Sequence, residues 1–433
     1  MKYLVLLLAA FSLFGGAEVS AQAESYTTII EGKDYGPAIT KLVLTLTEEV
    51  NPDDLSPETF SVEATKTYDK FNEETGENEE ITETGAIEVV DVYTSDEEGE
   101  PVEEASNVVT LELEVHPDNV LTSPFNYNML TGRNTDVGVS HVISLEEPLG
   151  NLEELSLTVD SQEEIIYEGT TDYTTDVYTY EDETFGEIEL EYAYYEVESE
   201  EPAPLIVLLH GGGEGGNDTN LVLLGNKVVA LNSKEIQAYF EDGVNILAPQ
   251  SPTMWLDDGS GEMTTNGDSM YTEALSNLIT EFVDTHDNID QDRVYLGGGS
   301  NGGYMTLNLA IENPGYFAAI FPICHAYQSE WIDEDELAVL SETPTWFIHA
   351  LNDVIVEYEP TTGALHERLV EAGHENLHLT TFDNVVDTSG EFQDEEGNPY
   401  EYLGHWSWIY FFNDEVTDEA GVNIYEWLAE QSN

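Results

Sequence analysis

The pattern of apolar and polar positions divides the chain into two parts. Between residues 26 and 159, apolar and polar side chains alternate in short segments that acidic turns separate, most clearly at 38–46, 86–90, 108–115 and 155–159. Alternation with a period of two, rich in β-branched residues, is typical of strands with one buried face. Several such strands predict a β-sandwich of immunoglobulin-like size. We find no pattern of catalytic residues in this part of the chain.

The second part begins after a polar stretch at residues 160–185, which is rich in Asp, Glu, Thr and Tyr. We place the domain junction there and predict one domain over 24–175 and another over 176–433. A continuous apolar run at 205–209 is expected for a strand buried on both faces. Further strands are predicted at 244–248, 293–296, 317–322, 345–350 and 377–382, with helices near 271–284, 362–372 and 424–430. Alternating strands and helices predict a mostly parallel sheet with helices on both faces.

The charge of the chain excludes several classes of protein. Its 433 residues include 90 acidic and 10 basic side chains, so the formal net charge is −80. So few Lys and Arg cannot neutralise a nucleic acid or an anionic membrane surface. With 40% hydrophobic residues the chain can still bury a core. Because molar salt shortens the Debye length to about 3 Å and screens this repulsion, we expect a protein adapted to saline surroundings.

The first 23 residues have the features of an export signal. Lys2 precedes an apolar run over residues 3–14, and small residues follow up to Ala23. The run is too short for a permanent transmembrane helix, so we expect cleavage after Ala23 and a secreted, soluble product. The single cysteine, Cys324, leaves no partner for an intramolecular disulfide and is expected to be a buried apolar residue. The oligomeric state remains open.

A glycine-rich turn stands between a predicted strand and an apolar helix. Residues 298–303 read Gly-Gly-Ser-Asn-Gly-Gly. A G-x-S-x-G turn in this context lifts the serine hydroxyl above the edge of the sheet, because the glycines permit a sharp turn. The pattern therefore predicts that Ser300 is a nucleophile. A serine hydroxyl also needs a histidine base and an acid that orients this base.

The order of residues in such hydrolases is serine, acid, histidine. Asp353 lies in a polar loop after the predicted strand 345–350, at the edge of the sheet where ligands gather. His405 follows the last predicted strand and a long loop. We therefore predict a triad of Ser300, Asp353 and His405. Other histidines lie on or beside predicted strands and helices, where structural roles are expected: His349, His366, His374 and His378.

The oxyanion of an acyl-transfer intermediate needs hydrogen-bond donors. Glycines after the first buried strand allow backbone N–H groups to approach a substrate, so we predict donors at Gly211 and Gly212, and a third at Asn301 beside the nucleophile. His210 is expected to fix this loop. No cofactor is required. Acidic clusters such as residues 394–398 lack the spacing of a helix-loop-helix calcium site, and we predict no metal.

Four further residues are candidates for the substrate pocket. Trp255, Trp331 and Trp406 could form an apolar or aromatic acyl site, and core packing is an equal alternative for each. His325 stands near the carboxyl end of a predicted strand and could line the pocket, although a structural role is the stronger expectation.

Four segments carry a family resemblance: residues 209–218, 247–252, 298–304 and 317–324. Together they resemble secreted α/β-hydrolases of the feruloyl-esterase and polyhydroxyalkanoate-depolymerase-like group, often labelled predicted peptidases. The chain looks most similar to members with an N-terminal immunoglobulin-like domain. The resemblance implies a serine esterase acting on small or polymeric esters, with Ser300, Asp353 and His405 in the roles already argued.

The sequence departs from these relatives in the pocket wall. Many of them have alanine at position 212, a basic residue near Gly216 and glycine at position 325, which here is His325. These differences leave the acyl group open. Two alternatives also stay open: a serine peptidase on the same fold, and a non-catalytic module that binds carbohydrate or protein.

Overall fold

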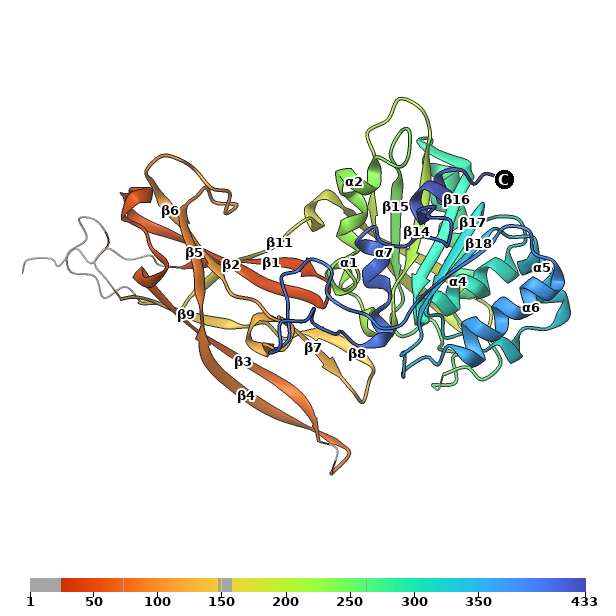
Figure 1. Ribbon diagram of the computed structural model, residues 1–433, viewed down its shortest axis with the longest axis horizontal. Coiled ribbons are helices and arrows are strands. Elements are labelled where there is room, and N and C mark those ends of the chain that lie inside the picture. Colours follow the sequence, from red (N-terminus) through yellow and green to blue (C-terminus); the bar gives the residue numbers. More distant parts are fainter. Residues whose placement is uncertain (1–24, 73, 147–148, 150–157, 262) are drawn as a thin grey trace, which may run out of the picture.

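A computed structural model describes residues 25–72, 74–146, 149, 158–261 and 263–433. The predicted signal at residues 1–23, and most of the strand predicted at 155–159, lie outside these residues. Figure 1 shows an all-β domain beside a larger domain in which helices surround a sheet. The predicted β-sandwich and α/β organisation is confirmed.

Two sheets form the N-terminal domain. The first has five strands in the order β11 (Gln162–Tyr167), β1 (Tyr26–Lys33), β2 (Gly36–Val50), β6 (Ser106–Leu113) and β5 (Val89–Thr94). The second has the order β10 (Thr158–Val159), β9 (Ser140–Leu145), β3 (Phe60–Asn72) and β4 (Glu77–Ile87). In β3 every second residue from Phe60 to Tyr68 is buried, as the alternating sequence predicts. These inward faces form the core of the sandwich.

An eight-stranded sheet organises the C-terminal domain. Its order is β12 (Thr174–Asp182), β13 (Gly186–Tyr195), β15 (Asn245–Gln250), β14 (Ala203–Leu209), β16 (Ile289–Gly299), β17 (Ala319–Ile323), β18 (Thr345–Ala350) and β19 (Leu377–Phe382). The pairs β12/β13 and β13/β15 are antiparallel, and the remaining pairs are parallel. β14 is buried over its whole length, which explains its unbroken apolar sequence.

Helices cover both faces of this sheet. Ile206 and Leu208 of β14 pack with residues of α1 (Thr219–Gly225), α2 (Lys234–Gln237), α7 (Trp408–Phe412) and α8 (Ile424–Ala429). Leu205 and Val207 point to the other face and pack with α3 (Thr272–Thr285), α4 (Asn301–Glu312), α5 (Glu334–Ser341) and α6 (Ala364–Ala372). No helix in the described part of the chain is long and apolar enough to cross a membrane.

Two projections make contacts between the two domains. A hairpin of the N-terminal domain, β7 (Phe125–Asn128) and β8 (Arg133–Asp136), reaches the C-terminal domain, where Arg133 donates to the Pro252 carbonyl oxygen at 2.8 Å. Residues 383–403, drawn in blue in Figure 1, run in the opposite direction, and the Tyr400 hydroxyl donates to Asp118 at 2.7 Å. The second projection directly precedes His405, so the N-terminal domain supports a predicted site residue.

Candidate active site

Ser300 occupies a strained turn between β16 and α4. Its φ of 57° and ψ of −112° lie in a region that non-glycine residues rarely adopt. The neighbouring glycines let two backbones approach, because a Cβ at Gly298 or Gly302 would collide with the carbonyl oxygen of Leu209 at the end of β14. The sequence therefore folds into a tight strand-turn-helix unit that leaves the serine half-buried at the edge of the sheet.

His405 and Asp353 complete a hydrogen-bonded chain with this serine. His405 Nε2 lies 2.8 Å from Ser300 Oγ, and His405 Nδ1 lies 2.7 Å from Asp353 Oδ2. Since an ionised carboxylate only accepts hydrogen bonds, Nδ1 carries the proton and Nε2 is free to accept the serine proton. The structure thus brings together the three residues predicted as a triad, at the separations that proton transfer requires.

The Asp353 carboxylate is fixed from several sides. Its Oδ1 accepts the backbone N–H groups of Ile355 and Val356 at 2.8 and 2.9 Å. The Nε2 atom of His349, on β18, lies 3.4 Å from its Oδ2. Burial favours the protonated acid, but His349, His405 and the Val356 N–H outweigh burial and hold the Asp353 pKa well below its usual value. Asp353 is therefore an anion at neutral pH.

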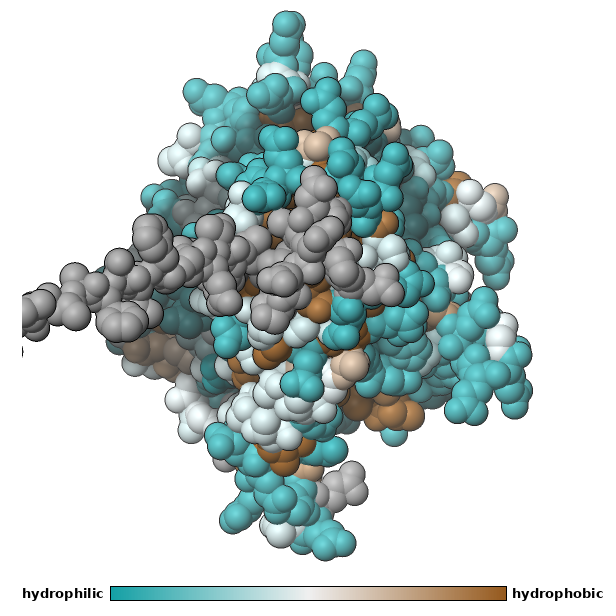
Figure 2. Space-filling view, turned by 90° about the vertical axis from the view of Figure 1, so that its left-hand side faces the viewer, coloured by the Kyte–Doolittle hydropathy of each residue, from teal (hydrophilic) through white to brown (hydrophobic). Residues whose placement is uncertain are grey.

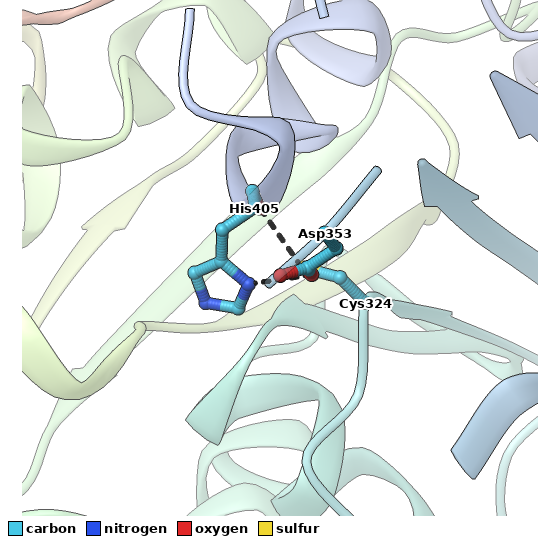
Figure 3. Close-up of side chains that lie close together, drawn as sticks. All are labelled: Cys324, Asp353 and His405. Carbon is cyan, nitrogen blue, oxygen red and sulfur yellow. Dashed lines mark hydrogen bonds and ion pairs between the residues drawn. The ribbon is translucent and has the colours of Figure 1, made fainter. Parts of the chain in front are cut away.

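Cys324 lies beside the same pair, as Figure 3 shows. The thiol is fully buried, as predicted, and donates to the backbone carbonyl oxygen of His405 at 3.3 Å. Burial disfavours the imidazolium, but Cys324 and the Asp353 carboxylate outweigh it and raise the pKa of His405. The ligand atoms of Cys324, Asp353 and His405 lie within 4.8 Å of one another, so this group could hold a metal ion. A cation there would replace the Asp353–His405 hydrogen bond.

The loop that carries the predicted oxyanion donors begins directly after β14. His210 lies close to the Gly211 carbonyl oxygen through Nδ1, at 2.5 Å, and its Nε2 accepts the Ser251 N–H at 3.1 Å. Burial lowers the pKa of His210 to about 4, so the ring is neutral and fixes the loop by hydrogen bonds. Asn301 begins α4, and its side-chain oxygen accepts the Trp255 N–H at 2.6 Å.

A buried carboxyl stands behind this loop. Burial raises the pKa of Glu214 to about 7, while Asn134 and the backbone N–H groups of Glu214 and Gly211 act in the opposite direction. The Gly211 N–H therefore lies near the Glu214 carboxyl, and the assignment of Gly211 as an oxyanion donor stays a prediction. Gly212 and Asn301 keep that assignment as a prediction.

Two of the four predicted pocket residues are in the core instead. Trp255 has no exposed surface, and its indole N–H donates to the His210 carbonyl oxygen at 3.2 Å. His325 is also fully buried and packs 5.5 Å from the Phe347 ring. Neither side chain can contact a substrate in this structure. Both side chains are therefore part of the packed interior.

The other two tryptophans are half-buried. Trp331 packs edge-on against Tyr327 at 5.6 Å, and Trp406 lies 6.2 Å from the Tyr402 ring. Their predicted role in substrate binding stays a prediction. Trp408 was not among the predicted pocket residues, and its ring meets the His405 imidazole edge-on at 5.4 Å. Trp408 also lines a small, mainly apolar pocket with Asn226 and Gly299, the residue before Ser300. The sequence signal for Trp408 was its position in an aromatic segment, two residues after Trp406.

The sheet order and the serine on the turn after β16 define an α/β-hydrolase. Residues 25–177 match the family model of the esterase Ig-like N-terminal domain, and residues 191–390 match that of the phospholipase/carboxylesterase family. The C-terminal domain is accordingly an α/β-hydrolase domain of the phospholipase/carboxylesterase type, and the N-terminal domain is of the esterase Ig-like type. No curated protein matches the chain.

Solved structures resemble this chain to different extents. The crystal structure of a thermostable esterase matches 95% of this chain and 100% of its own, with 24% identity and a TM-score of 0.72. An S-formylglutathione hydrolase from Agrobacterium tumefaciens matches 60% of this chain and 96% of its own, with 17% identity and a TM-score of 0.40. A feruloyl esterase module from Clostridium thermocellum matches 49% and 81%, with 15% identity and a TM-score of 0.35. The first of these shows that the two-domain fold extends over nearly the whole chain.

Proposed function

We propose that this protein is a secreted serine carboxylic-ester hydrolase. The observation that carries the proposal is the hydrogen-bonded chain from Ser300 Oγ through His405 to Asp353, on a serine held at positive φ. A solvent-facing serine without such partners has no base to accept its proton. The phospholipase/carboxylesterase family of the C-terminal domain supports an ester as the substrate.

The proposed reaction proceeds through an acyl-enzyme. His405 Nε2 accepts the proton of Ser300 as the serine oxygen attacks the ester carbonyl carbon. Backbone N–H groups near Gly212 and Asn301 stabilise the oxyanion, and His405 then donates its proton to the leaving alkoxide. Water, deprotonated by His405, attacks the acyl group and releases the acid. Asp353 keeps the proton of the neutral imidazole on Nδ1 and stabilises the imidazolium.

We infer that neutral, apolar esters are better substrates than anionic ones. The net charge of −80 repels anions. Apolar side chains are exposed beside the residues of the triad: Val354 and Ile355 follow Asp353, and Leu403 stands two residues before His405, with exposed fractions of 74%, 62% and 42%. These side chains offer contact area to an apolar acyl or alcohol group, such as that of an aromatic ester or a polyester.

Hydrolysis of p-nitrophenyl esters of increasing acyl length tests the proposal, with matched anilides in the same assay. Ester turnover without anilide turnover supports an esterase, and the length profile measures the acyl site. Turnover of anilides alone would replace the proposal by a peptidase. Absence of turnover, together with no labelling of Ser300 by a fluorophosphonate, would favour a binding module.

The predicted signal at residues 1–23 supports export, and the acidic surface supports a saline medium. In the described part of the chain only a few carboxylates have a cationic partner, in ion pairs made by Lys33, Lys41, Lys227, Arg293 and Arg368. Figure 2 shows one face of the molecule, on which hydrophilic residues predominate. Most of the repulsion between these acids must therefore be screened by dissolved ions.

Salt should stabilise the fold. Raising NaCl from about 0.05 M to about 2 M reduces the Debye length from more than 10 Å to less than 3 Å, so we expect the melting temperature to rise by several degrees. Differential scanning fluorimetry measures this shift. Sucrose at equal osmolality is the control, because it lacks ions. A melting temperature that is unchanged by salt, or raised equally by sucrose, would contradict adaptation to saline surroundings.

A further inference from the structure

Glu214 is a buried acid inside the predicted oxyanion loop. It ends the short 3-10 helix Gly212–Glu214, and only 5% of its surface is exposed. An acid buried in this place requires a reason, because a negative charge behind an oxyanion site opposes the charge that the site has to stabilise. The triad does not use this side chain.

Each carboxylate oxygen of Glu214 accepts a hydrogen bond from an asparagine. Oε1 accepts from Asn134 Nδ2 of β8 at 3.2 Å. Oε2 accepts from Asn226 Nδ2 at 3.0 Å, in the amide orientation that lets the Asn226 oxygen accept from Trp408 Nε1 at 3.3 Å. In this orientation Asn134 Nδ2, Asn226 Nδ2 and Trp408 Nε1 each meet an acceptor. The arrangement therefore requires two acceptor oxygens at Glu214, which an ionised carboxylate supplies.

Three nearby glycines allow this arrangement, because a Cβ at any of them would lie too close to Glu214 or Asn134. A Cβ at Gly211 would lie 2.9 Å from Glu214 Oε2, and a Cβ at Gly225 would lie 2.9 Å from Glu214 Cγ. A Cβ at Gly213 would lie 2.7 Å from Asn134 Nδ2. Two segments, the loop itself and the end of α1, thus pack against the carboxylate and its partner, so a displacement of Glu214 would displace the loop.

The Trp408 end of this hydrogen-bonded chain reaches His405, the base of the triad. The Trp408 ring contacts His405 edge-on, and a Cβ at Gly299 would lie 3.0 Å from Trp408 Cε3. Trp408 therefore packs against both the serine turn and the imidazole, with its indole N–H directed to Asn226 and thus to Glu214. One carboxylate is linked to the oxyanion loop directly and to the histidine through two side chains.

We propose that Glu214 is a positioning residue whose carboxylate aligns the oxyanion loop with His405 by joining Asn134, Asn226 and Trp408. The proposal rests on the proposed esterase function, in which both the loop and His405 act in the transition state. Glu214 contacts neither the substrate nor the reacting atoms. Its effect on the reaction passes through the Gly211–Gly213 backbone and the Trp408 ring.

Glu214→Gln provides the test because the glutamine keeps the shape and replaces one acceptor by a donor. If that donor faces Asn226, the Asn226 amide must turn and present its own N–H₂ group to Trp408 Nε1–H. If it faces Asn134, the contact with β8 is lost. We expect kcat to fall by about 10- to 100-fold with little change in KM, as for a partly misplaced oxyanion donor.

The pH profile separates positioning from a purely structural role. In the native protein, protonation of Glu214 removes an acceptor, and because burial raises its pKa to about 7 this adds to the loss of kcat/KM on acidification. His405 and Tyr127 are the titratable groups that share a charge interaction with Glu214. We expect the acid limb of the profile to become shallower in Glu214→Gln, leaving the titration of His405.

Two further variants keep the test decisive. Trp408→Phe retains the ring beside His405 and removes the N–H that bonds Asn226, and it should lower kcat in the same direction. Glu31→Gln removes a carboxylate on β1 that pairs with Lys33 and should leave kcat unchanged. If the native protein turns over esters and folded Glu214→Gln keeps both its kcat and its pH profile, the inference about Glu214 is overturned and the proposed function is not. Lack of ester turnover by the native protein would instead overturn the proposed function.

Discussion

Replacement of Ser300 by alanine is expected to lower kcat on p-nitrophenyl esters by about five to six orders of magnitude. The alanine removes the Oγ atom that lies 2.8 Å from His405 Nε2, and so removes the nucleophile and the acyl-enzyme with it. Alanine tolerates the turn as well as serine does, because both carry a single Cβ substituent at φ 57°. The loss should therefore appear in turnover and not in the melting temperature.

Ser341→Ala is a matched control, since this serine is half-buried on α5 and its hydroxyl bonds only to the Ala338 carbonyl oxygen among the described residues. It should retain native activity. Active-site labelling by a fluorophosphonate should occur in the control and disappear in Ser300→Ala. Residual activity above about one per cent in a contaminant-free Ser300→Ala preparation would remove Ser300 from the nucleophile role.

Asp353→Asn should lower kcat by about four orders of magnitude while the protein stays folded. The side-chain oxygen of asparagine must stay at the position of Oδ1, because the N–H groups of Ile355 and Val356 both donate there. The new N–H₂ group then faces His405 Nδ1, which must become an acceptor. The proton moves to Nε2, and the imidazole can no longer accept the proton of Ser300.

Steady-state kinetics on the same esters measure this effect, and circular dichroism checks the fold. Asp383→Asn is the matched control, because Asp383 follows β19 as Asp353 follows β18, but its side chain is exposed. This control should remain near the native rate. Comparable rates for native protein and Asp353→Asn, with a large loss in Asp383→Asn, would transfer the acid role to the next strand.

The sequence predicted the serine turn and its setting because the required information is local. Strand β18 has the bounds predicted for it, and Asp353 lies in the loop directly after this strand. The turn at Ser300 depends on glycines within a few residues, which the sequence displays directly. His405 could be placed by its order after the last strand. Such features can be predicted from the sequence because neighbouring residues determine them.

The rest depended on contacts between distant segments. Trp255 and His325 have the composition of pocket residues, but packing from other strands and helices buries them. β11 and β12 lie in the stretch predicted as the domain junction, because these partly exposed strands contain no long apolar run. Asn134 meets Glu214 across 80 residues of sequence, and no local pattern could connect them.

The projection at residues 383–403, which precedes His405, connects the folding of the two domains. Asp118 and Tyr400 are 282 positions apart, yet they bond directly, and the ring of His116 meets those of Phe392 and Tyr400 edge-on. The position of the loop that carries His405 therefore depends on contacts with the folded N-terminal domain. Loss of the N-terminal fold is accordingly expected to displace the histidine loop as well as the sandwich.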